Sequence, residues 1–539
     1  MLKLILGRSG SGKTTTLREL AKRSLLEKPD RPVFLIVPEQ ASFENERAML
    51  ALLGAEDAQR VHVLSFSRLA DEAFRLYGGG AGRRLDDGGR SLFMSLALSA
   101  VQDRLEFYRR SAASGELVSL MLGVSSELKL CAVSPEKLGE TAGRLPEGAL
   151  SRKLREVSLI LSAYDAMVAQ SYLDPLDDLT RALPLLRENG FFAGALVAVD
   201  SFTAFTVQEY QLLRVILEQS EETVISLCAD SLDDPDGGVG LFSLVKRTGK
   251  QLRTLARESD VPVAAPVVLP SSARFQCEGL RVLEENLYRP RREPLSGADC
   301  ACVYRAASPY EEAAFVSATI RRLVMEEGLR YGDFTVIARD ADRYAGVLDR
   351  ALESREIPYF MDQPAAIESE PLMRFLLAAL QTVRTGFRTD ELLLCLKTGL
   401  AGLSPEEIAR LENYAFLWSV SGRTWREEWT AHPRGFEEVW TDEDKQALEE
   451  LNDCRRRAVE PLEELAAVVE NGTGEACARA LYRYLERTQA AEALRTLAVD
   501  LEKAGRPDLA ERGIRLWDML MAILDQCAMV LGETVLGCA

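Results

Sequence analysis

The first ninety residues alternate between two hydrophobic periods. Short apolar runs of the kind found in buried strands occur at Leu2–Leu6, Val33–Val37 and Val61–Ser65. Segments with apolar residues three and four positions apart predict helices at Thr14–Leu26, Glu39–Leu53 and Phe66–Tyr77. Strands that alternate with helices in this way predict a parallel sheet.

The pattern changes after a glycine-rich stretch near residue 80. From about Arg90 to Glu188 the apolar spacing is helical, and strand-like runs return only at Ala195–Val199 and Thr223–Leu227. Because strands resume after the helical stretch, we expect residues 91–188 to be an insertion into a sheet that is completed after it.

A second alternating region begins near residue 300. It predicts strands at Cys302–Ala306, Phe334–Ala338 and Tyr359–Met361, with helices at Tyr310–Glu326 and Arg343–Ser354. From about Glu368 onward the pattern is helical. The predicted fold class is therefore α/β. It comprises a parallel-sheet domain (1–90 and 189–298), its helical insertion (91–188), the start of a second α/β domain (299–365) and a second helical insertion (366–539).

Composition narrows the possible functions. The 539 residues carry a formal charge of −18 and are 47% hydrophobic, which is typical of a globular protein. No apolar run approaches the roughly 18 residues of a membrane span, so we expect a cytoplasmic protein with no membrane partner. The acidic balance argues against a protein that coats DNA phosphates alone, but not against a DNA channel shared with a partner. Ten cysteines without a CxxC pair and only two histidines argue against a disulfide framework or a zinc ribbon.

One motif indicates nucleotide chemistry. The segment Gly7-Arg8-Ser9-Gly10-Ser11-Gly12-Lys13-Thr14 fits G-x-x-x-x-G-K-[ST] and lies between a predicted strand and a predicted helix. Glycines allow phosphates to approach the unpaired amides of the loop and of the helix N-terminus. Lys13 would contact the β and γ phosphates of ATP, and the Thr14 hydroxyl would bind Mg²⁺. The sheet domain is thus interpreted as a P-loop NTPase domain.

Such a loop needs an acidic partner at the end of a neighbouring strand. Asp200, directly after the run Ala195–Val199, is the best candidate, although a strand-end aspartate can also simply cap a turn. The next residue is Ser201, where an ATP-hydrolysing enzyme of this kind usually carries a glutamate that orients water. We therefore expect weak or absent hydrolysis.

Several segments, in this order, resemble one protein family, the AddB (RexB-like) subunits of bacterial AddAB helicase–nucleases, which are relatives of superfamily 1 DNA helicases. The resemblance rests on LILGRSGSGKTTTL from Leu4, Val37–Gln40 with Glu44–Arg47, Val63–Leu69, Asp200–Thr206, Ser308–Glu312, Phe334–Arg339, Leu396–Leu400 and Leu411–Tyr414. It covers nearly the whole chain.

The resemblance implies a subunit of an ATP-dependent helicase and exonuclease (a hydrolase) that processes DNA double-strand breaks in recombinational repair. It implies ATP and Mg²⁺ as cofactors, an AddA-like helicase–nuclease partner in a heterodimer, single- and double-stranded DNA as ligands, and recognition of the Chi sequence. Family members are about twice this length, and their nuclease domain and iron–sulfur cluster are expected only in the C-terminal half that this chain lacks. Two E-x-K fragments, at Glu127–Lys129 and Glu443–Lys445, are interpreted as solvated helix charges rather than nuclease residues.

The expected site residues fall into two groups. The nucleotide group is Gly7, Gly10, Ser11, Gly12, Lys13, Thr14, Thr15, Asp200 and Arg339, with Thr14 and Asp200 as metal ligands and Arg339 as a candidate γ-phosphate sensor or an ordinary surface arginine. The DNA group follows the second and third strands and consists of Pro38, Gln40, Ser65, Phe66 and Arg68. Phe66 could stack on a base or belong to the core, and Arg68 could be a plain surface charge.

Two other functions fit the motif. A stand-alone P-loop ATPase or phosphotransferase would use the same loop, and a scaffold could retain it as a vestigial nucleotide pocket. Ser201 favours the helicase-like subunit or the scaffold over a stand-alone enzyme, because both tolerate the loss of a water-orienting carboxylate.

Overall fold

The computed structural model describes residues 1–233, 238–270, 274–275, 277–288, 300–361, 367–436 and 439–535. The chain divides into two compact units, Met1–Ala301 and Cys302–Ala539. The domain boundaries expected at residues 298–299 and 365–366 both involve positions outside the described residues.

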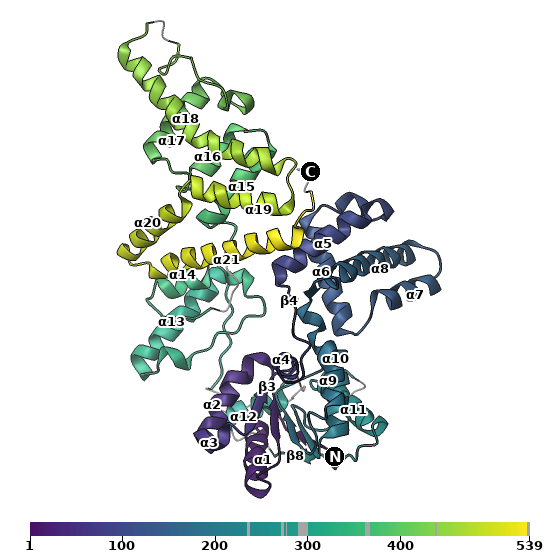
Figure 1. The fold of residues 1–539 in the computed structure, drawn as a ribbon. Coiled ribbons are helices and arrows are strands. Elements are labelled where there is room, and N and C mark those ends of the chain that lie inside the picture. Colours follow the sequence, from purple (N-terminus) through teal and green to yellow (C-terminus); the bar gives the residue numbers. More distant parts are fainter. Residues whose placement is uncertain are drawn as a thin grey trace. The chain divides into compact units, whose positions relative to one another are not determined.

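The first unit is built on a parallel six-stranded sheet (Figure 1). Its strand order is β3-β2-β6-β7-β1-β8. Its strands are β1 (Leu2–Leu6), β2 (Val33–Ile36), β3 (Val61–Leu64), β6 (Leu196–Val199), β7 (Glu222–Leu227) and β8 (Val267–Val268). The first five were predicted within one or two residues, and their parallel pairing confirms the predicted α/β sheet. The edge strand β8 was not predicted, because two residues are too few to show a period.

Alternating side chains of each strand face two helical layers. Ile5, Leu35 and Ala198 pack with α1 (Lys13–Glu27) and α2 (Ser42–Leu53) on one face of the sheet. Leu4 and Val197 pack on the other face. The helices of that second layer are α4 (Phe66–Tyr77), α9 (Asp178–Glu188), α10 (Val207–Gln219) and α11 (Ser243–Glu258). The strands are therefore buried on both sides, as their continuous apolar runs indicate.

Four helices form the body of the insertion and pack on one another: α5 (Asp87–Val101), α6 (Gly115–Leu130), α7 (Pro135–Arg144) and α8 (Ala149–Val168). A two-residue parallel pair, β4 (Arg83–Arg84) with β5 (Tyr172–Leu173), joins the two ends of this helical group. The fragment Glu127–Lys129 differs from its expected role at the lysine. Lys129 is not a solvated helix charge: its side chain is only 12% exposed and forms ion pairs with Asp174 at 2.9 Å and Asp177 at 2.6 Å.

The second unit departs from its prediction. The helix α13 (Pro309–Glu327) is present as expected, and α14 (Leu348–Glu353) is shorter than expected. None of the three predicted strands, 302–306, 334–338 and 359–361, forms a ladder among the described residues. Their apolar side chains lie in solvent, with Val303 100%, Ile337 90% and Phe360 91% exposed. A strand is stable only against partner strands, and these segments have none within the described residues.

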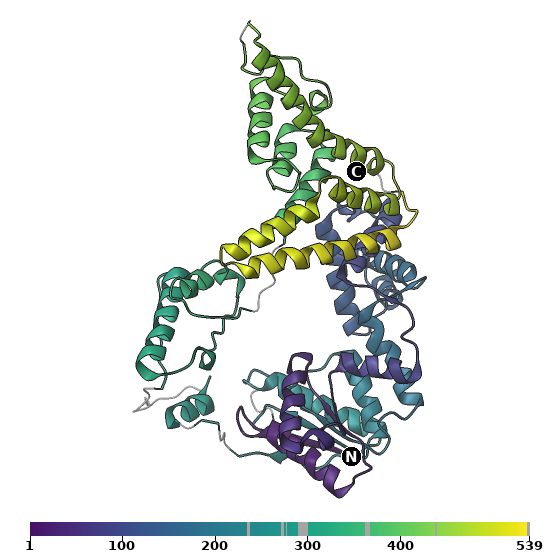
Figure 2. The ribbon, with the colours of Figure 1, turned by 60° about the vertical axis from the view of Figure 1, so that its left-hand side comes forward.

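Helices make up the rest of the second unit. They are α15 (Pro371–Arg384), α16 (Thr389–Leu396), α17 (Pro405–Leu417), α18 (Asp442–Val469), α19 (Gly474–Arg487), α20 (Ala490–Lys503) and α21 (Pro507–Leu531). Helices α20 and α21 run side by side (Figure 2). The core of this unit includes the fully buried Trp425, Phe375 and Leu462. Across the described residues, no single helix has the length and apolarity of a membrane span; α6 and α7 reach both only as a pair, with a bend of 94° between them.

Candidate functional site

The loop between β1 and α1 has the backbone that its glycines allow. Gly10 and Gly12 adopt φ angles of +75° and +89°, a region that other residues rarely enter. At Gly7 the limit is steric, because an added Cβ would collide with the Ser11 side chain. The loop therefore turns sharply from the carboxyl end of β1 into α1, as the motif predicts.

The N-terminus of α1 presents unpaired donors. No side chain among the described residues caps this end, and no acidic residue lies in the first turn. The amides of Lys13, Thr14 and Thr15 precede the first intrahelical bond, which Thr16 makes to the Gly12 carbonyl at 2.9 Å. These donors and the positive end of the helix dipole favour an anion at this position.

Lys13 lies against the loop itself. Its Nζ donates hydrogen bonds to the carbonyl oxygens of Gly7, at 2.8 Å, and Arg8, at 2.9 Å. The ammonium group is therefore held at the mouth of the loop, where it could contact a phosphate after a change of rotamer.

Asp200 meets the loop across one intervening strand. It follows β6, while β7 separates β6 from β1. Asp200 is 2% exposed, and its carboxylate accepts a hydrogen bond of 2.6 Å from Thr14 Oγ1. Ser226 on β7 donates to the other carboxylate oxygen, and the Asp200 amide bonds the Ile36 carbonyl at 2.9 Å. The structure thus brings together the two expected metal ligands.

Ser201 adopts an unusual backbone conformation. Its φ is +68°, and its hydroxyl donates to Asp200 Oδ2 at 3.2 Å. The side chain at this position therefore supports the aspartate rather than offering a carboxylate to a water molecule.

A cleft of about 390 Å³ opens at this edge of the sheet, a size suited to a small-molecule ligand. It is lined by Ser9, Gly10, Gly12, Lys13, Thr14, Thr15, Asp200, Ser201, Phe202, Thr203, Ser226, Cys228 and Arg274. The unpaired amides, the lysine and the Thr14–Asp200 pair fit a nucleotide polyphosphate with Mg²⁺.

Two arginines near the loop were not predicted. Arg274 lines the cleft from the segment after β8, and no motif marks it. Arg8 is a variable position of the motif, and its Nε donates to Glu284 on α12 (Glu278–Asn286) at 2.9 and 3.1 Å. Its guanidinium also lies 5.1 Å from the centre of the Phe242 ring. Arg8 therefore ties the loop to α12 and does not line the cleft.

The five DNA candidates have different surroundings. Gln40 is exposed and Pro38 half-buried beside it, whereas Ser65 is buried and caps α4 by accepting from the Arg68 amide at 3.2 Å. Phe66 is 7% exposed and packs 5.3 Å from the Phe202 ring, so it belongs to the core and offers no stacking face in this structure. Arg68 forms an ion pair of 2.6 Å with Glu46.

Arg339 belongs to the second unit. It is exposed, and the strand that was expected to end there is absent. Its role as a phosphate sensor stays a prediction.

Comparison with known proteins identifies the family. A family profile described as "ADDB, N-terminal" matches residues 4–284. Proteins named as subunits of an ATP-dependent helicase/deoxyribonuclease are similar along nearly the whole chain. The relative from Geobacillus thermodenitrificans is 31% identical over 100% of this chain and 48% of its own length. The relative from Thermoanaerobacter pseudethanolicus is 30% identical over 99% of this chain and 47% of its own length. The relative from Clostridium novyi is 28% identical over 98% of this chain and 46% of its own length. The chain spans about half the length of these relatives, and it belongs to the AddB family.

Proposed function

We propose that this chain is the ATP-binding, helicase-like part of a complex that processes DNA double-strand breaks and that holds and scans single-stranded DNA. The names of the relatives support a helicase and deoxyribonuclease assembly with more than one subunit. The resemblance to the AddB family supports an AddA-like partner and Chi recognition.

The hydrogen bond between Thr14 and Asp200 carries the nucleotide part of the proposal. These residues are 186 positions apart, and their side-chain oxygens lie within 2.6 Å beside the glycine-rich loop. A turn that merely happened to be rich in glycine would not require a buried carboxylate from another strand. The arrangement is the one expected for a Mg²⁺–nucleotide site.

The residues would share the work as follows. The amides of the loop and the first turn of α1 would bind phosphate oxygens, and Lys13 would leave the Gly7 and Arg8 carbonyls to add its charge. Thr14 and Asp200 would bind Mg²⁺. ATP would supply a γ-phosphoryl group that can be transferred to water. Ser201 carries no carboxylate that could act as a general base for that water. We therefore expect binding with little turnover.

Nucleotide binding can be tested with the isolated chain. Labelled ATP should bind in the presence of Mg²⁺, and Lys13→Ala should weaken binding about tenfold to a hundredfold because a charge-assisted contact is lost. Lys22→Ala, on the same helix but away from the cleft, is the matched control and should bind normally. Hydrolysis of many ATP molecules per second by the isolated chain would contradict the proposal. ATP binding that depends on neither Lys13 nor Mg²⁺ would also contradict it.

The proposed DNA face can be tested through an ion pair. Glu46 and a DNA phosphate would compete for the Arg68 guanidinium. Arg68→Ala should therefore weaken binding of single-stranded DNA, and Glu46→Ala should strengthen it. Gln40→Ala should also weaken it. Affinity and its salt dependence are measured by titration of labelled DNA with and without an AddA-like partner. If neither Arg68→Ala nor Gln40→Ala changes affinity or salt slope in the complex, this face does not hold DNA.

A further inference from the structure

Helix α11 reverses the charge balance of the chain. Its sixteen residues, SLVKRTGKQLRTLARE, contain five basic side chains and one acidic side chain. The whole chain has a formal charge of −18. A local excess of this kind on an acidic protein marks a surface that attracts anions.

Four of these cations lie on one side of the helix without a partner. Arg247, Lys250, Arg253 and Arg257, here named the α11 basic stripe, follow one another at intervals of three or four residues. Three are exposed and Arg253 is half-buried. None of the four side chains forms a hydrogen bond or ion pair with any described residue. The one acidic residue of the helix, Glu258, is held by Arg214 at 2.7 Å.

An apolar strip runs beside the stripe. Residues 261–268 read VPVAAPVV and form the edge of the sheet next to β1. The Leu2 amide bonds the Pro262 carbonyl at 2.8 Å, and the Ala264 amide bonds the Leu2 carbonyl at 2.9 Å. Pro262 and Pro266 are exposed, and Val268 is 55% exposed. Two prolines keep other strands from pairing with this edge, so its exposed apolar surface calls for a different explanation.

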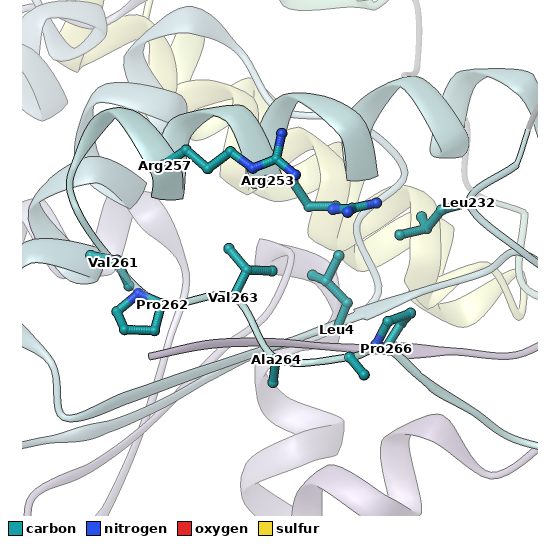
Figure 3. A pocket seen from close by; sticks show the side chains of 10 residues that line it. Leu4, Leu232, Arg253, Arg257, Val261, Pro262, Val263, Ala264 and Pro266 are labelled. Carbon is teal, nitrogen blue, oxygen red and sulfur yellow. The ribbon is translucent and has the colours of Figure 1, made fainter.

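Part of the stripe and part of the strip line a common cleft: Arg253 and Arg257 from the stripe, and residues 261–266 from the strip. Figure 3 shows Arg253 and Arg257 on α11 above the segment from Val261 to Pro266, with Leu4 of β1 between them. The cleft has a volume of about 430 Å³. It therefore presents guanidinium groups along one wall and aliphatic groups along the other.

We propose that the α11 basic stripe and residues 261–268 bind single-stranded DNA, with phosphates on the four cations and bases against the apolar strip. The inference rests on the proposed function for its choice of DNA, but it uses a surface separate from both the nucleotide cleft and the Gln40–Arg68 face. The stripe is about 15 Å long from Arg247 to Arg257 at the α-helical rise. A stripe of that length can contact no more than about four successive phosphates of one strand.

Two competing ligands match the surface less well. Duplex DNA presents phosphates and sugars on its outside, and its stacked bases could not use the apolar strip. An acidic protein segment could form ion pairs with the four cations. It would not, however, place an apolar group at each repeat against residues 261–268. A single strand supplies both chemistries at once.

The test is a titration of labelled single-stranded DNA into the full chain, alone and with an AddA-like partner. Arg253→Gln combined with Arg257→Gln should weaken binding about tenfold at about 0.1 M salt and reduce the salt slope by about 1.4, for two lost phosphate contacts. Arg60→Gln combined with Arg75→Gln removes the same charge from two other arginines of the first unit, which pair with Asp57 and Glu72, and it should have little effect. Equal thermal stability of both double variants shows that folding is intact.

A second variant tests the apolar strip. Val268→Ser should weaken binding of an ordinary oligonucleotide about threefold, less than the loss of a base stacked on an aromatic side chain, and leave an abasic strand unaffected. The inference is overturned if the stripe variant binds like the parent, if the control variant loses as much, or if duplex DNA of equal length shows the same loss. It is also overturned if polyglutamate binds the parent more tightly than a single strand of equal charge and loses that binding in the stripe variant. A parent chain that binds no DNA even with its partner defeats the DNA part of the proposed function, whereas an unaffected stripe variant defeats this inference alone.

Discussion

Two regions of this chain share a sequence pattern and differ in structure. In the first unit, the runs at residues 33–37 and 61–65 form β2 and β3, which pair with each other, and β2 pairs also with β6. In the second unit, the runs at 302–306, 334–338 and 359–361 are also mainly apolar and also alternate with helical segments, yet they form no strand among the described residues. An apolar run therefore specifies only a tendency to pair, and the ladder depends on partner strands elsewhere in the fold.

The largest effect is expected from a charge placed in each region. Val197 on β6 is 0% exposed, whereas Ile337 is 90% exposed. Val197→Asp should lower the free energy of unfolding of the first unit by more than about 4 kcal/mol, because a carboxylate would be buried without a partner. Ile337→Asp should change stability by less than about 0.5 kcal/mol. Urea denaturation followed by circular dichroism measures both. A large loss of stability from Ile337→Asp would mean that residues 334–338 are buried in solution. The apolar runs of the two units would then not differ as described.

The sheet and its nucleotide site were predictable because local and distant signals agree. Strand, glycine-rich loop and helix follow one another between Leu2 and Glu27, so the loop needs no information from elsewhere. Asp200 was identified because a carboxylate directly after a strand lies at the edge where parallel strands end. Its contact with Thr14 then follows from strand order.

Other features depend on contacts that leave no trace in a local pattern. The Arg8 bond to Glu284 joins residues 276 positions apart, and nothing in the motif distinguishes Arg8 from a solvated arginine. Phe66 was a possible stacking residue by its place after β3, but helix α4 turns it toward Phe202 and the core. Lys129 resembled a solvated charge, but α6 packs it against Asp174. In each case the tertiary partner decides the role.

The smallest expected effect concerns the polar residues that follow β2 and β3. Parallel pairing brings Glu39 to Ser65 and Ser67, whose hydroxyls both donate to its carboxylate. These hydrogen bonds, with a smaller contribution from Arg68, lower the pKa of Glu39 below its ordinary value of 4.5. A carboxyl group whose pKa is lower in the folded state stabilises the fold above its ordinary pKa, and this stabilisation is lost as the pH falls through the folded pKa. Glu39 is mostly exposed, so its contribution should be only a few tenths of a kcal/mol.

Glu39→Gln should therefore destabilise the first unit slightly at pH 7, and the difference from the parent should shrink as the pH falls below about 4.5. Glu56→Gln, on an exposed helix turn in the same unit, is the control and should show no such convergence. Urea midpoints at closely spaced pH values between about 3 and 7 measure the effect. A difference that grows toward low pH would show that Glu39 is not held by Ser65 and Ser67. The contact of Glu39 with Ser65 and Ser67 would then not follow from the pairing of β2 with β3. The contrast with the unpaired segments of the second unit would lose that support.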